Sequence, residues 1–451
     1  MIRLLIDTCE VVVTMDDAGT EISGGSILIE DGQITWIGSG EPPDVADAER
    51  VDGRDTVALP GLINTHHHLY QAMTRARATD QGLFGWLTEL YPVWAGVNAE
   101  WERAAATVGL AELALAGCST TTDHHYVFPK GAEGLLEAEI DAAREIGMRF
   151  HPCRGSMDLG ASAGGLPPDD VCQDADTILD HTQEVVRRFH DPRPGSMLRI
   201  AIAPCSPFSA TQRLMEDSAN LARALGVRLH THIAETLDEA AFCQDRFGVR
   251  PVELLDGWGW LGPDVWLAHC VHLSEKDIKR IAESGTGVAW CPTSNLRLGS
   301  GIAPARALLD ESATVGLGVD GSASNDSGNL LAEARQGMLV SRAGGDPEAM
   351  TAREALRVAT RGGAACLGRD DLGSLEPGKR ADLALFDVSE LPFAGAEADL
   401  VAAVALCAPQ RVRHLLVEGR SVVRDGRLVT SDEHAIAAEG RRVGRLIASR
   451  T

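Results

Sequence analysis

Short apolar segments at both ends of the chain have the pattern of β-strands. Leu4–Val13 is apolar and β-branched, and Gly25–Glu30 and Gln33–Ile37 flank the dipeptide Asp31-Gly32, which predicts a hairpin with a type I′ turn. Toward the other end we expect strands at Ala381–Phe386 and Val412–Val417, and a hairpin at Val422–Val429 that turns at Asp425-Gly426. Neither end has enough strands to bury a sheet face alone, so we expect both to build one β-sandwich.

The middle of the chain alternates helical and strand patterns, which is the βα repeat of a parallel barrel. The predicted helices are Glu100–Leu115, Gly134–Ile146, Ala175–Phe189 and Gln212–Leu225, and the predicted strands include Leu198–Ala203, Arg228–His232, Val265–His269, Gly287–Cys291 and Thr314–Val319. We therefore predict the α/β class: a (β/α)8 TIM-type barrel with a small β-sandwich domain formed from both termini. The sandwich is expected at 1–58 and 368–451, the second part ending in a helix, and the barrel at 59–367.

Polar, ligand-type residues stand where several of these strands end. His66 and His68 follow an apolar run, and alternate residues of a strand share a face, so these two should project together while His67 points away. Two imidazoles on one face can bind one metal ion. His232 ends a later strand, with Glu235 three residues beyond it.

Two further strands end in the same way, at His269 and at Asp320. A single histidine or aspartate at a strand end is more often structural. In a barrel of this kind, however, the carboxyl ends of all strands converge on one face, where catalytic residues lie. The sequence therefore predicts one polar site built from distant strands.

The segments PGLINTHHH, HTHIAE, AHCVHL and GLGVDGSASND resemble the amidohydrolase superfamily over nearly the whole chain, including the late segment GSLEPGKRADLALFD. More narrowly, GLINTHHHLYQ, DHHYVFP, RGSM, APCSPFS, HTHIAETLDE and DGSASND are similar to bacterial 8-oxoguanine (isocytosine) deaminases. The related triazine hydrolases share some of these strings less well.

The resemblance implies a role for each strand-end residue. It implies that His66, His68, His232 and Asp320 bind metal, Asp320 thereby joining the catalytic set, that Glu235 shuttles protons, and that His269 polarises the attacking water or the developing oxyanion. Three neutral imidazoles and one carboxylate suit Zn²⁺, which lowers the pKa of a bound water to about 7.

One metal ion is expected rather than two. Relatives with two ions bridge them by a modified lysine or a glutamate near the end of the fourth strand. Here no lysine occurs between Lys130 and Lys276, and the strand end Ala203–Ser209 has no carboxylate.

Several residues are candidates for contact with the substrate. The carboxamide of Gln71 offers a donor and an acceptor, which fits an amide-like ring edge. Tyr126, Arg154 and Cys205 end other predicted strands and are expected to line the pocket. For three more histidines and two tryptophans we expect mainly structural roles, namely His124, His125, His272, Trp86 and Trp94.

The predicted function is hydrolytic deamination of an amino-substituted nucleobase, 8-oxoguanine to urate and ammonia, with isocytosine also accepted. The alternative enzyme is an s-triazine or other heteroaromatic amino or chloro hydrolase. An inactive amidohydrolase-like structural or binding protein is the alternative of another class. Such a protein would be expected to have lost ligands, whereas this chain retains all four and Glu235.

The amino-acid composition argues against some classes of binding partner. The formal charge of -24 opposes binding to a nucleic-acid backbone, which needs a basic surface. The ten cysteines are scattered without a CxxC pair, which favours reduced thiols and a cytoplasmic location. No signal peptide and no uncharged apolar run of 18 residues is apparent, so no membrane partner is expected. We expect a homo-oligomer that acts on a small molecule.

Overall fold

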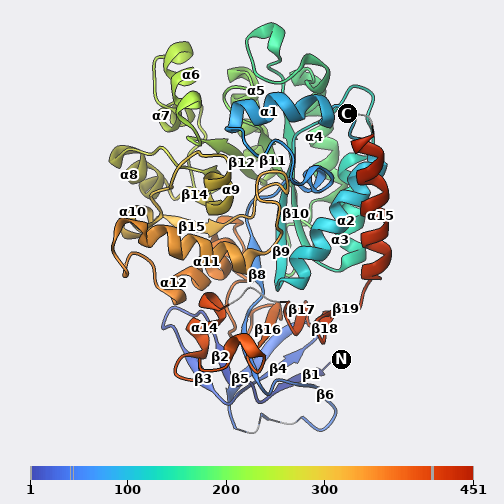
Figure 1. Cartoon of the computed structure of the whole chain (residues 1–451), viewed down its shortest axis with the longest axis vertical. Helices are drawn as coiled ribbons and strands as arrows, with labels where there is room; N and C mark the ends of the chain where they lie inside the picture. The colour runs from blue at the N-terminus through green and yellow to red at the C-terminus, as the bar shows by residue number, and fades with distance from the viewer. Residues whose placement is uncertain (1–2, 41, 44, 408–410, 450–451) are drawn as a thin grey trace.

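An eight-stranded parallel barrel forms the centre of the molecule (Figure 1). The computed structural model describes residues 3–40, 42–43, 45–407 and 411–449. In order around the barrel the strands are β8 (Leu62–Asn64), β9 (Cys118–His125), β10 (Arg149–Ser156), β11 (Ala201–Pro204), β12 (Arg228–Ile233), β13 (Val265–His269), β14 (Gly287–Trp290) and β15 (Thr314–Leu317). The N–H of Thr65 donates to the carbonyl of Leu317 at 2.9 Å, which joins the last strand to the first.

Helices cover the outside of this barrel and its mouth. They are α1 (Leu83–Trp94), α2 (Ala99–Leu115), α3 (Leu135–Ile146), α4 (Ala175–Phe189), α5 (Gln212–Leu225), α6 (Leu237–Phe247), α7 (Pro251–Gly257), α8 (Glu275–Ser284), α9 (Pro292–Arg297), α10 (Ala305–Asp310), α11 (Leu330–Ser341), α12 (Ala352–Arg357) and α13 (Gly363–Cys366). The C-terminal helix α15 (Glu433–Ala448) returns to pack on α2, where Gly440 lets the two backbones approach closely (Figure 1).

Local capping explains why two helices begin and end where the pattern predicts. The side chain of Asp174 accepts the N–H of Thr177 at the start of α4, and Thr211 does the same for Leu214 at the start of α5. Gly226, with a φ of 68°, terminates α5 in the left-handed conformation that glycine adopts readily. The predicted and observed bounds of both helices coincide.

The strand predictions differ most where the barrel interior is polar. In place of the predicted strand Leu198–Ala203, the structure has β11, which is shorter and begins at residue 201. Leu198 makes only an isolated bridge to Phe150. The apolar pattern does not mark β9 and β10, because β9 reads CSTTTDHH and β10 carries His and Arg. These polar side chains are enclosed by the barrel and its helices, and several of them bond to backbone carbonyls, such as Thr122 to His151 and His124 to Ala203.

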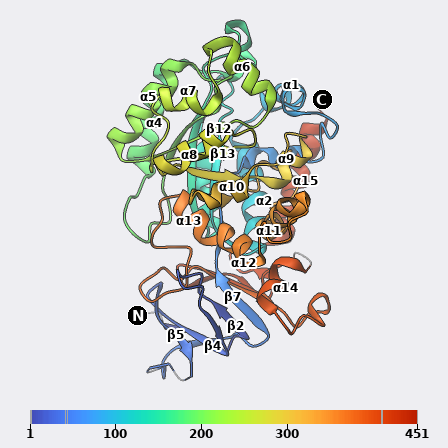
Figure 2. The ribbon, with the colours of Figure 1, turned by 90° about the vertical axis from the view of Figure 1, so that its left-hand side faces the viewer.

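Two sheets at the amino end of the barrel form the β-sandwich (Figure 2). The four-stranded sheet has the order β5 (Gln33–Ser39), β4 (Gly25–Glu30), β1 (Arg3–Asp7), β6 (Glu49–Asp52). The seven-stranded sheet has the order β19 (Arg427–Leu428), β18 (Arg420–Arg424), β17 (His414–Val417), β16 (Leu383–Asp387), β7 (Thr56–Pro60), β2 (Val11–Val13), β3 (Glu21–Ser23). A short helix, α14 (Leu400–Leu406), packs beside β2 and β7.

Strands from the two ends of the chain pair directly. β16 runs antiparallel to β7, which in turn runs parallel to β2, and a shared apolar core lies between the two sheets. The predicted sandwich from both termini is confirmed, whereas the division at residues 58 and 367 stays a prediction. Both hairpins turn as predicted, because Asp31, Gly32, Asp425 and Gly426 all have positive φ. The run Leu4–Val13 is broken at Thr8 (φ 57°), so β1 and β2 enter different sheets.

A buried ion pair ties the sandwich to the barrel. Arg149, at the start of β10, donates twice to the carboxylate of Asp382, at 2.9 Å each, and once to Glu418 at 2.6 Å. Burial opposes the charge of Arg149, but Asp382 outweighs it and raises the pKa of the guanidinium above its usual value. No helix among the described residues is both long and apolar enough to cross a membrane.

Replacing Arg149 by Met should lower the free energy of unfolding by about 3–5 kcal/mol, because the carboxylate of Asp382 would lose its buried counter-charge. The exposed pair Arg144–Asp141 offers the control, since Arg144→Met should change stability by about 0.5 kcal/mol or less. Urea denaturation measures both. Equal effects of the two substitutions would contradict a special role for the buried pair.

Candidate metal centre and active site

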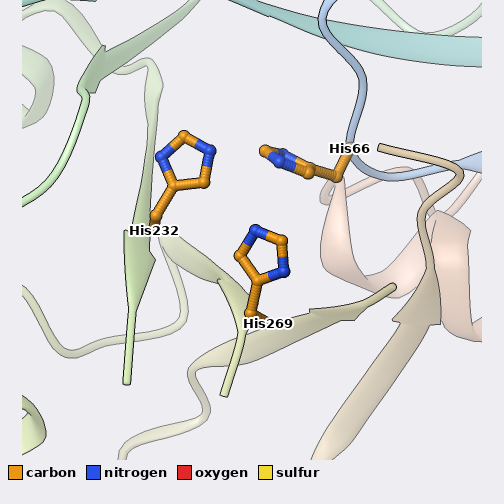
Figure 3. A group of neighbouring side chains, drawn as sticks. All are labelled: His66, His232 and His269. Carbon is orange, nitrogen blue, oxygen red and sulfur yellow. The ribbon is translucent and has the colours of Figure 1, made fainter. Parts of the chain in front are cut away.

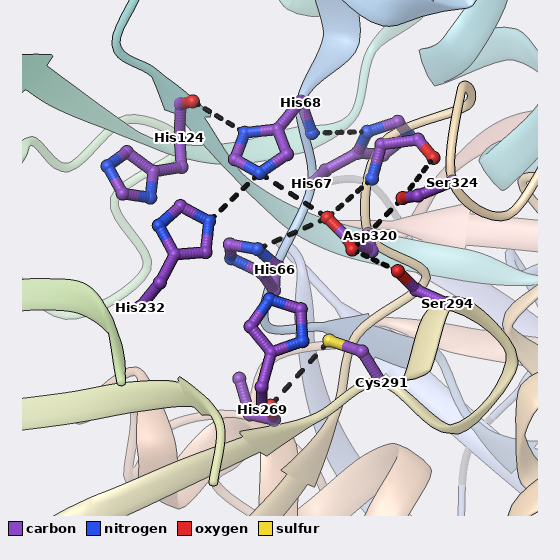
Figure 4. A network of polar contacts seen from close by, with 12 residues as sticks. His66, His67, His68, His124, His232, His269, Cys291, Ser294, Asp320 and Ser324 are labelled. Carbon is purple, nitrogen blue, oxygen red and sulfur yellow. Dashed lines mark hydrogen bonds and ion pairs between the residues drawn. The ribbon is translucent and has the colours of Figure 1, made fainter. Parts of the chain in front are cut away.

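Four side chains from the ends of three strands, β8, β12 and β15, meet at the mouth of the barrel. The Nε2 atoms of His66 and His68 each lie 3.3 Å from Oδ1 of Asp320, and the Nε2 atoms of His68 and His232 are 3.1 Å apart. All four residues are buried. Figure 3 shows the rings of His66 and His232 turned toward that of His269, and Figure 4 adds His68 and Asp320. The structure thus brings together the predicted ligands.

Hydrogen bonds on the far side of each ring determine which nitrogen is free. His68 donates from Nδ1 to the carbonyl of His124 at 2.8 Å, and His232 donates from Nδ1 to the carbonyl of Cys205 at 2.7 Å. Since a carbonyl can only accept, both Nδ1 atoms carry the proton. Each Nε2 atom therefore presents its lone pair to the centre.

The same reasoning applies to His66 through His230. His230 donates from Nδ1 to the carbonyl of Trp266 at 2.8 Å, so its Nε2 is an acceptor. That Nε2 lies 2.8 Å from Nδ1 of His66, which must therefore carry the proton. Nε2 of His66 is left buried without a hydrogen-bond partner. An unpaired imidazole nitrogen held in this way is the arrangement of a metal ligand.

The carboxylate of Asp320 is oriented by its own loop and by the loop after β14. Ser294 donates to its Oδ2 at 2.5 Å and Ser324 at 3.0 Å, while the N–H of Gly321 donates to Oδ1 at 2.7 Å (Figure 4). These three donors stabilise the ionised form of the carboxylate. Asp320 is thus an anion among imidazoles whose pKa values burial lowers.

Glu235 and His269 form a second pair beside this centre. Oε2 of Glu235 lies 3.6 Å from Nε2 of His269, whose Nδ1 bonds to Oδ1 of Asn295 at 2.9 Å. Burial raises the pKa of Glu235 and the Asp320 charge adds to this effect. Burial alone would lower the pKa of His269, but the carboxylate of Glu235 reverses the direction. A carboxyl with a raised pKa can both accept and return a proton near neutral pH.

Backbone strain accumulates at these strand ends. Ala234, His269 and Asp320 have φ values of 52°, 72° and 62°, in the left-handed region that costs most residues energy. The carboxylate of Glu239 accepts the N–H groups of Ala234 and Glu235 at 2.9 and 2.8 Å, which holds the first of these turns. The turns aim the polar side chains inward from strands that end beneath them.

A narrow cavity of ≈ 30 Å³ opens beside the metal ligands. It is lined by His68, Leu83, Trp86, Leu87, Tyr91, Tyr126, Cys205, Phe208, His232, Glu235, His269, Leu298, Asp320 and Ser324. Helix α1 supplies four of these residues, so the position of α1 determines the depth of the cavity. Two predicted substrate contacts, Tyr126 and Cys205, are on its wall. Burial raises the pKa of the Cys205 thiol to about 12, so Cys205 contributes a neutral thiol to this wall.

The other two predicted contacts lie outside the lining. Gln71 is enclosed next to Gly321, where a Cβ would lie only 1.9 Å from its amide oxygen, and that oxygen has no hydrogen-bond partner. Arg154 stacks on the ring of Phe128 and donates to Gln173 at 2.7 Å. Their roles toward substrate stay predictions.

The remaining candidates, for which mainly structural roles were expected, lie in different surroundings. Trp94 is buried in the core, whereas Trp86 lines the cavity with its ring N–H bound to the carbonyl of Ala323. His124 stacks on His232 at 4.7 Å between ring centres, and His272 donates to the carbonyl of Ser300.

Sequence reasoning did not single out the residues that orient the site. Ser294 and Asn295 lie in α9, directly after β14, and Glu239 lies in α6. The first two satisfy the criterion that identified the ligands, since they are polar residues that closely follow an apolar strand. Glu239 has no such signal, because its role appears only through its contact with the preceding turn.

Barrel enzymes that hydrolyse with the help of a metal ion carry their ligands at this end of the strands, and the geometry places the chain in that class of hydrolase. The chain belongs to the amidohydrolase family, whose model matches residues 57–422. It is 48% identical to the 8-oxoguanine deaminase of Pseudomonas aeruginosa over 426 residues, 94% of each chain. It is 39% identical to the hydroxydechloroatrazine ethylaminohydrolase of Pseudomonas sp. strain ADP, over 94% of this chain and 92% of that one.

Among solved structures, the chain resembles the atrazine chlorohydrolase of Arthrobacter aurescens complexed with zinc. The TM-score is 0.94 at 36% identity, over 98% of this chain and all of that one. An adenosine deaminase from Xanthomonas campestris with bound zinc has a TM-score of 0.87 at 27% identity, over 99% of both chains. These proteins share the whole architecture, sandwich included.

Replacing Ser294 by Ala should weaken metal binding about 10–100-fold, because Asp320 would lose a hydrogen bond that orients it. Competition with a chelator measures the affinity. Ser218→Ala is the matched control, since the Ser218 hydroxyl is buried without a partner and far from the ligands in α5. An unchanged affinity in the Ser294 variant would show that the carboxylate needs no such support.

Proposed function

We propose that this protein is a zinc-dependent deaminase that converts 8-oxoguanine to urate and ammonia and also accepts isocytosine. The observation that carries the proposal is the Glu235–His269 pair set beside four metal ligands, in a chain 48% identical to an 8-oxoguanine deaminase. Hydrolytic deamination needs an activated water, a group that moves protons, and a wall that recognises the ring. Each requirement has residues at the mouth of this barrel.

We propose a single Zn²⁺ held by Nε2 of His66, His68 and His232 and by Asp320. Three imidazoles and a carboxylate match the donor preference of zinc, and two structural relatives contain zinc. When bound, the ion acts as a Lewis acid that activates water at neutral pH. Asp320 is the only carboxylate in the candidate metal groups at the barrel mouth among the described residues, which favours one ion over a bridged pair.

We assign the proton transfers to Glu235. In the proposed reaction its carboxylate takes a proton from the attacking water and delivers it to the ring nitrogen next to the reacting carbon. This lets the ring accept the electron pair as the new C–O bond forms. The second proton of that water passes from the new hydroxyl to the amino group. The C–N bond then breaks as the hydroxyl becomes a carbonyl, and ammonia leaves. His269, oriented by Asn295, stabilises the negative charge that develops on oxygen.

Recognition of the ring is assigned to the cavity wall and to Gln71. Both proposed substrates carry an amino group on a carbon flanked by ring nitrogens, next to an amide-like N–H/C=O edge. The unpartnered amide oxygen of Gln71 can accept such an N–H when the ring lies against the turn after Asp320. Buried polar groups that need a partner reject rings lacking it more strongly than an apolar wall does.

We also infer a cytoplasmic location, which the ten free thiols support. The homo-oligomer stays an expectation.

Replacing Glu235 by Gln should lower kcat by roughly 10²–10⁴-fold, because the amide retains the size of the side chain but carries no transferable proton. Metal analysis should find that this variant retains its ion, whereas His232→Asn loses one equivalent. Glu253→Gln, at an exposed position on α7, is the control and should keep full activity. Near-normal turnover of the Glu235 variant would refute the proton-shuttle role.

Steady-state kinetics across a panel of rings should give the highest kcat/KM for 8-oxoguanine, followed by isocytosine. Cytosine and adenine lack the matching edge and should be poorer by on the order of 10⁴-fold. Guanine tests the position-8 oxygen, and a chlorinated triazine tests the hydrolase alternative suggested by the 39% identical ethylaminohydrolase. A higher kcat/KM for either of these two would reassign the substrate while leaving the hydrolase in place.

A further inference from the structure

A second group of ionisable side chains is enclosed behind the metal centre, between β9 and the helices α2 and α3 (Figure 1). It consists of Glu102 on α2, Asp123 and His125 on β9, and Glu139 on α3, all with 0% exposure. Most of their polar atoms have no hydrogen-bond partner, namely both oxygens of Glu102, both of Glu139, Oδ2 of Asp123 and Nδ1 of His125. Buried polar atoms in such number require a ligand or a set of protons.

The ring of His125 shows what kind of partner is needed. Its Nε2 lies 2.9 Å from the carbonyl of Val127 and must donate to it. In the neutral ring Nδ1 is then a lone pair, yet it faces Oε2 of Glu102 at 3.3 Å. Two lone pairs in that arrangement repel unless a cation or a proton lies between them.

The charges of the three carboxyl groups also call for a bound cation or for protons. Among the described residues, no lysine or arginine forms an ion pair with Glu102, Asp123 or Glu139. Burial raises the pKa of Asp123, as does the charge of Glu102, and burial raises the pKa of Glu139 well above its usual value. Burial alone would lower the pKa of His125, but the Glu102 carboxylate raises it, so His125 supplies at most one positive charge to the cluster. Three carboxyl groups enclosed together are therefore still costly to ionise.

We propose that Glu102, His125 and Glu139 bind a second divalent metal ion, Zn²⁺ or Mn²⁺, that stabilises the barrel wall. The candidate ligand atoms of these three residues all lie within 4.8 Å of one another. Two atoms 3.3 Å apart, each about 2.1 Å from an ion, subtend about 104° at the ion, which is near tetrahedral. Mixed imidazole and carboxylate donors suit these metals, and two carboxylates balance the charge.

The neighbouring Asp123 connects this site to the catalytic centre. Its Oδ1 accepts the N–H of Leu69 at 2.6 Å, and Leu69 directly follows the ligand His68. An ion bound here would hold α2, β9 and α3 together behind that backbone. It would act by position and stability, not by contact with substrate.

Metal analysis of the full-length protein tests the proposal. The protein is stripped with a chelator, reloaded with Zn²⁺ or Mn²⁺, desalted and measured by mass spectrometry of the elements. The wild type should hold two equivalents, and His232→Asn should retain one. Glu102→Gln/Glu139→Gln should also retain one, because it removes two ligands while the catalytic set is intact. Glu100→Gln/Glu145→Gln, at exposed positions of the same helices, should keep two.

Three results would overturn the proposal. One is a single equivalent in the wild type that His232→Asn abolishes, which would mean that protons alone neutralise the cluster. Another is two equivalents retained by Glu102→Gln/Glu139→Gln. The third is loss of both equivalents in His232→Asn, which would place two ions at the barrel mouth and also contradict the single catalytic zinc.

Anomalous diffraction from crystals of the wild type provides a readout that does not depend on folding of the variants. Data at the absorption edge of the loaded metal should give one peak among His66, His68 and His232. A second peak should lie between Glu102 and His125. Absence of that second peak at full loading would overturn the second site even if the double variant failed to fold.

Discussion

Closure of the barrel brings the predicted catalytic residues together. His66 and His68 follow the first strand, and Asp320 follows the last, some 250 residues later in the chain. Two backbone hydrogen bonds join these edges, from Thr65 to Leu317 at 2.9 Å and from Asp320 to His66 at 3.1 Å. The second bond joins two of the proposed metal ligands directly. The metal centre therefore exists only when the sheet is closed, and a bound ion in turn stabilises the closed sheet.

Within the closed barrel, desolvation sets the chemistry. Burial lowers the pKa values of the three ligand imidazoles, so they are neutral and able to bind metal without competition from protons. The carbonyls of His124 and Cys205 then fix which nitrogen carries the proton. The same burial raises the pKa of Glu235 above its usual value. One physical effect thus sets the protonation of both the proposed ligands and the proposed proton carrier.

Two groups of buried charges outside the barrel mouth connect separate elements of the described structure. Arg149 and Asp382 join the barrel to the sandwich. Glu102 on α2 and Glu139 on α3 lie close together behind β9. In the first case an arginine supplies the counter-charge. At the second cluster, no arginine or lysine of the described chain supplies a counter-charge. This contrast points to a bound cation.

Local signals in the sequence determined a large part of this molecule. The Asp-Gly turns, the caps of α4 and α5, and the polar residues at strand ends all act within about four residues, so the chain reveals them directly. These strand-end positions marked His66, His232 and Asp320 as candidates, and the resemblance to the amidohydrolase superfamily implied that they bind metal. Only the tertiary structure decided which partners orient them. Ser294 meets Asp320 across 26 residues and His66 meets His230 across 164, because barrel closure brings these elements together.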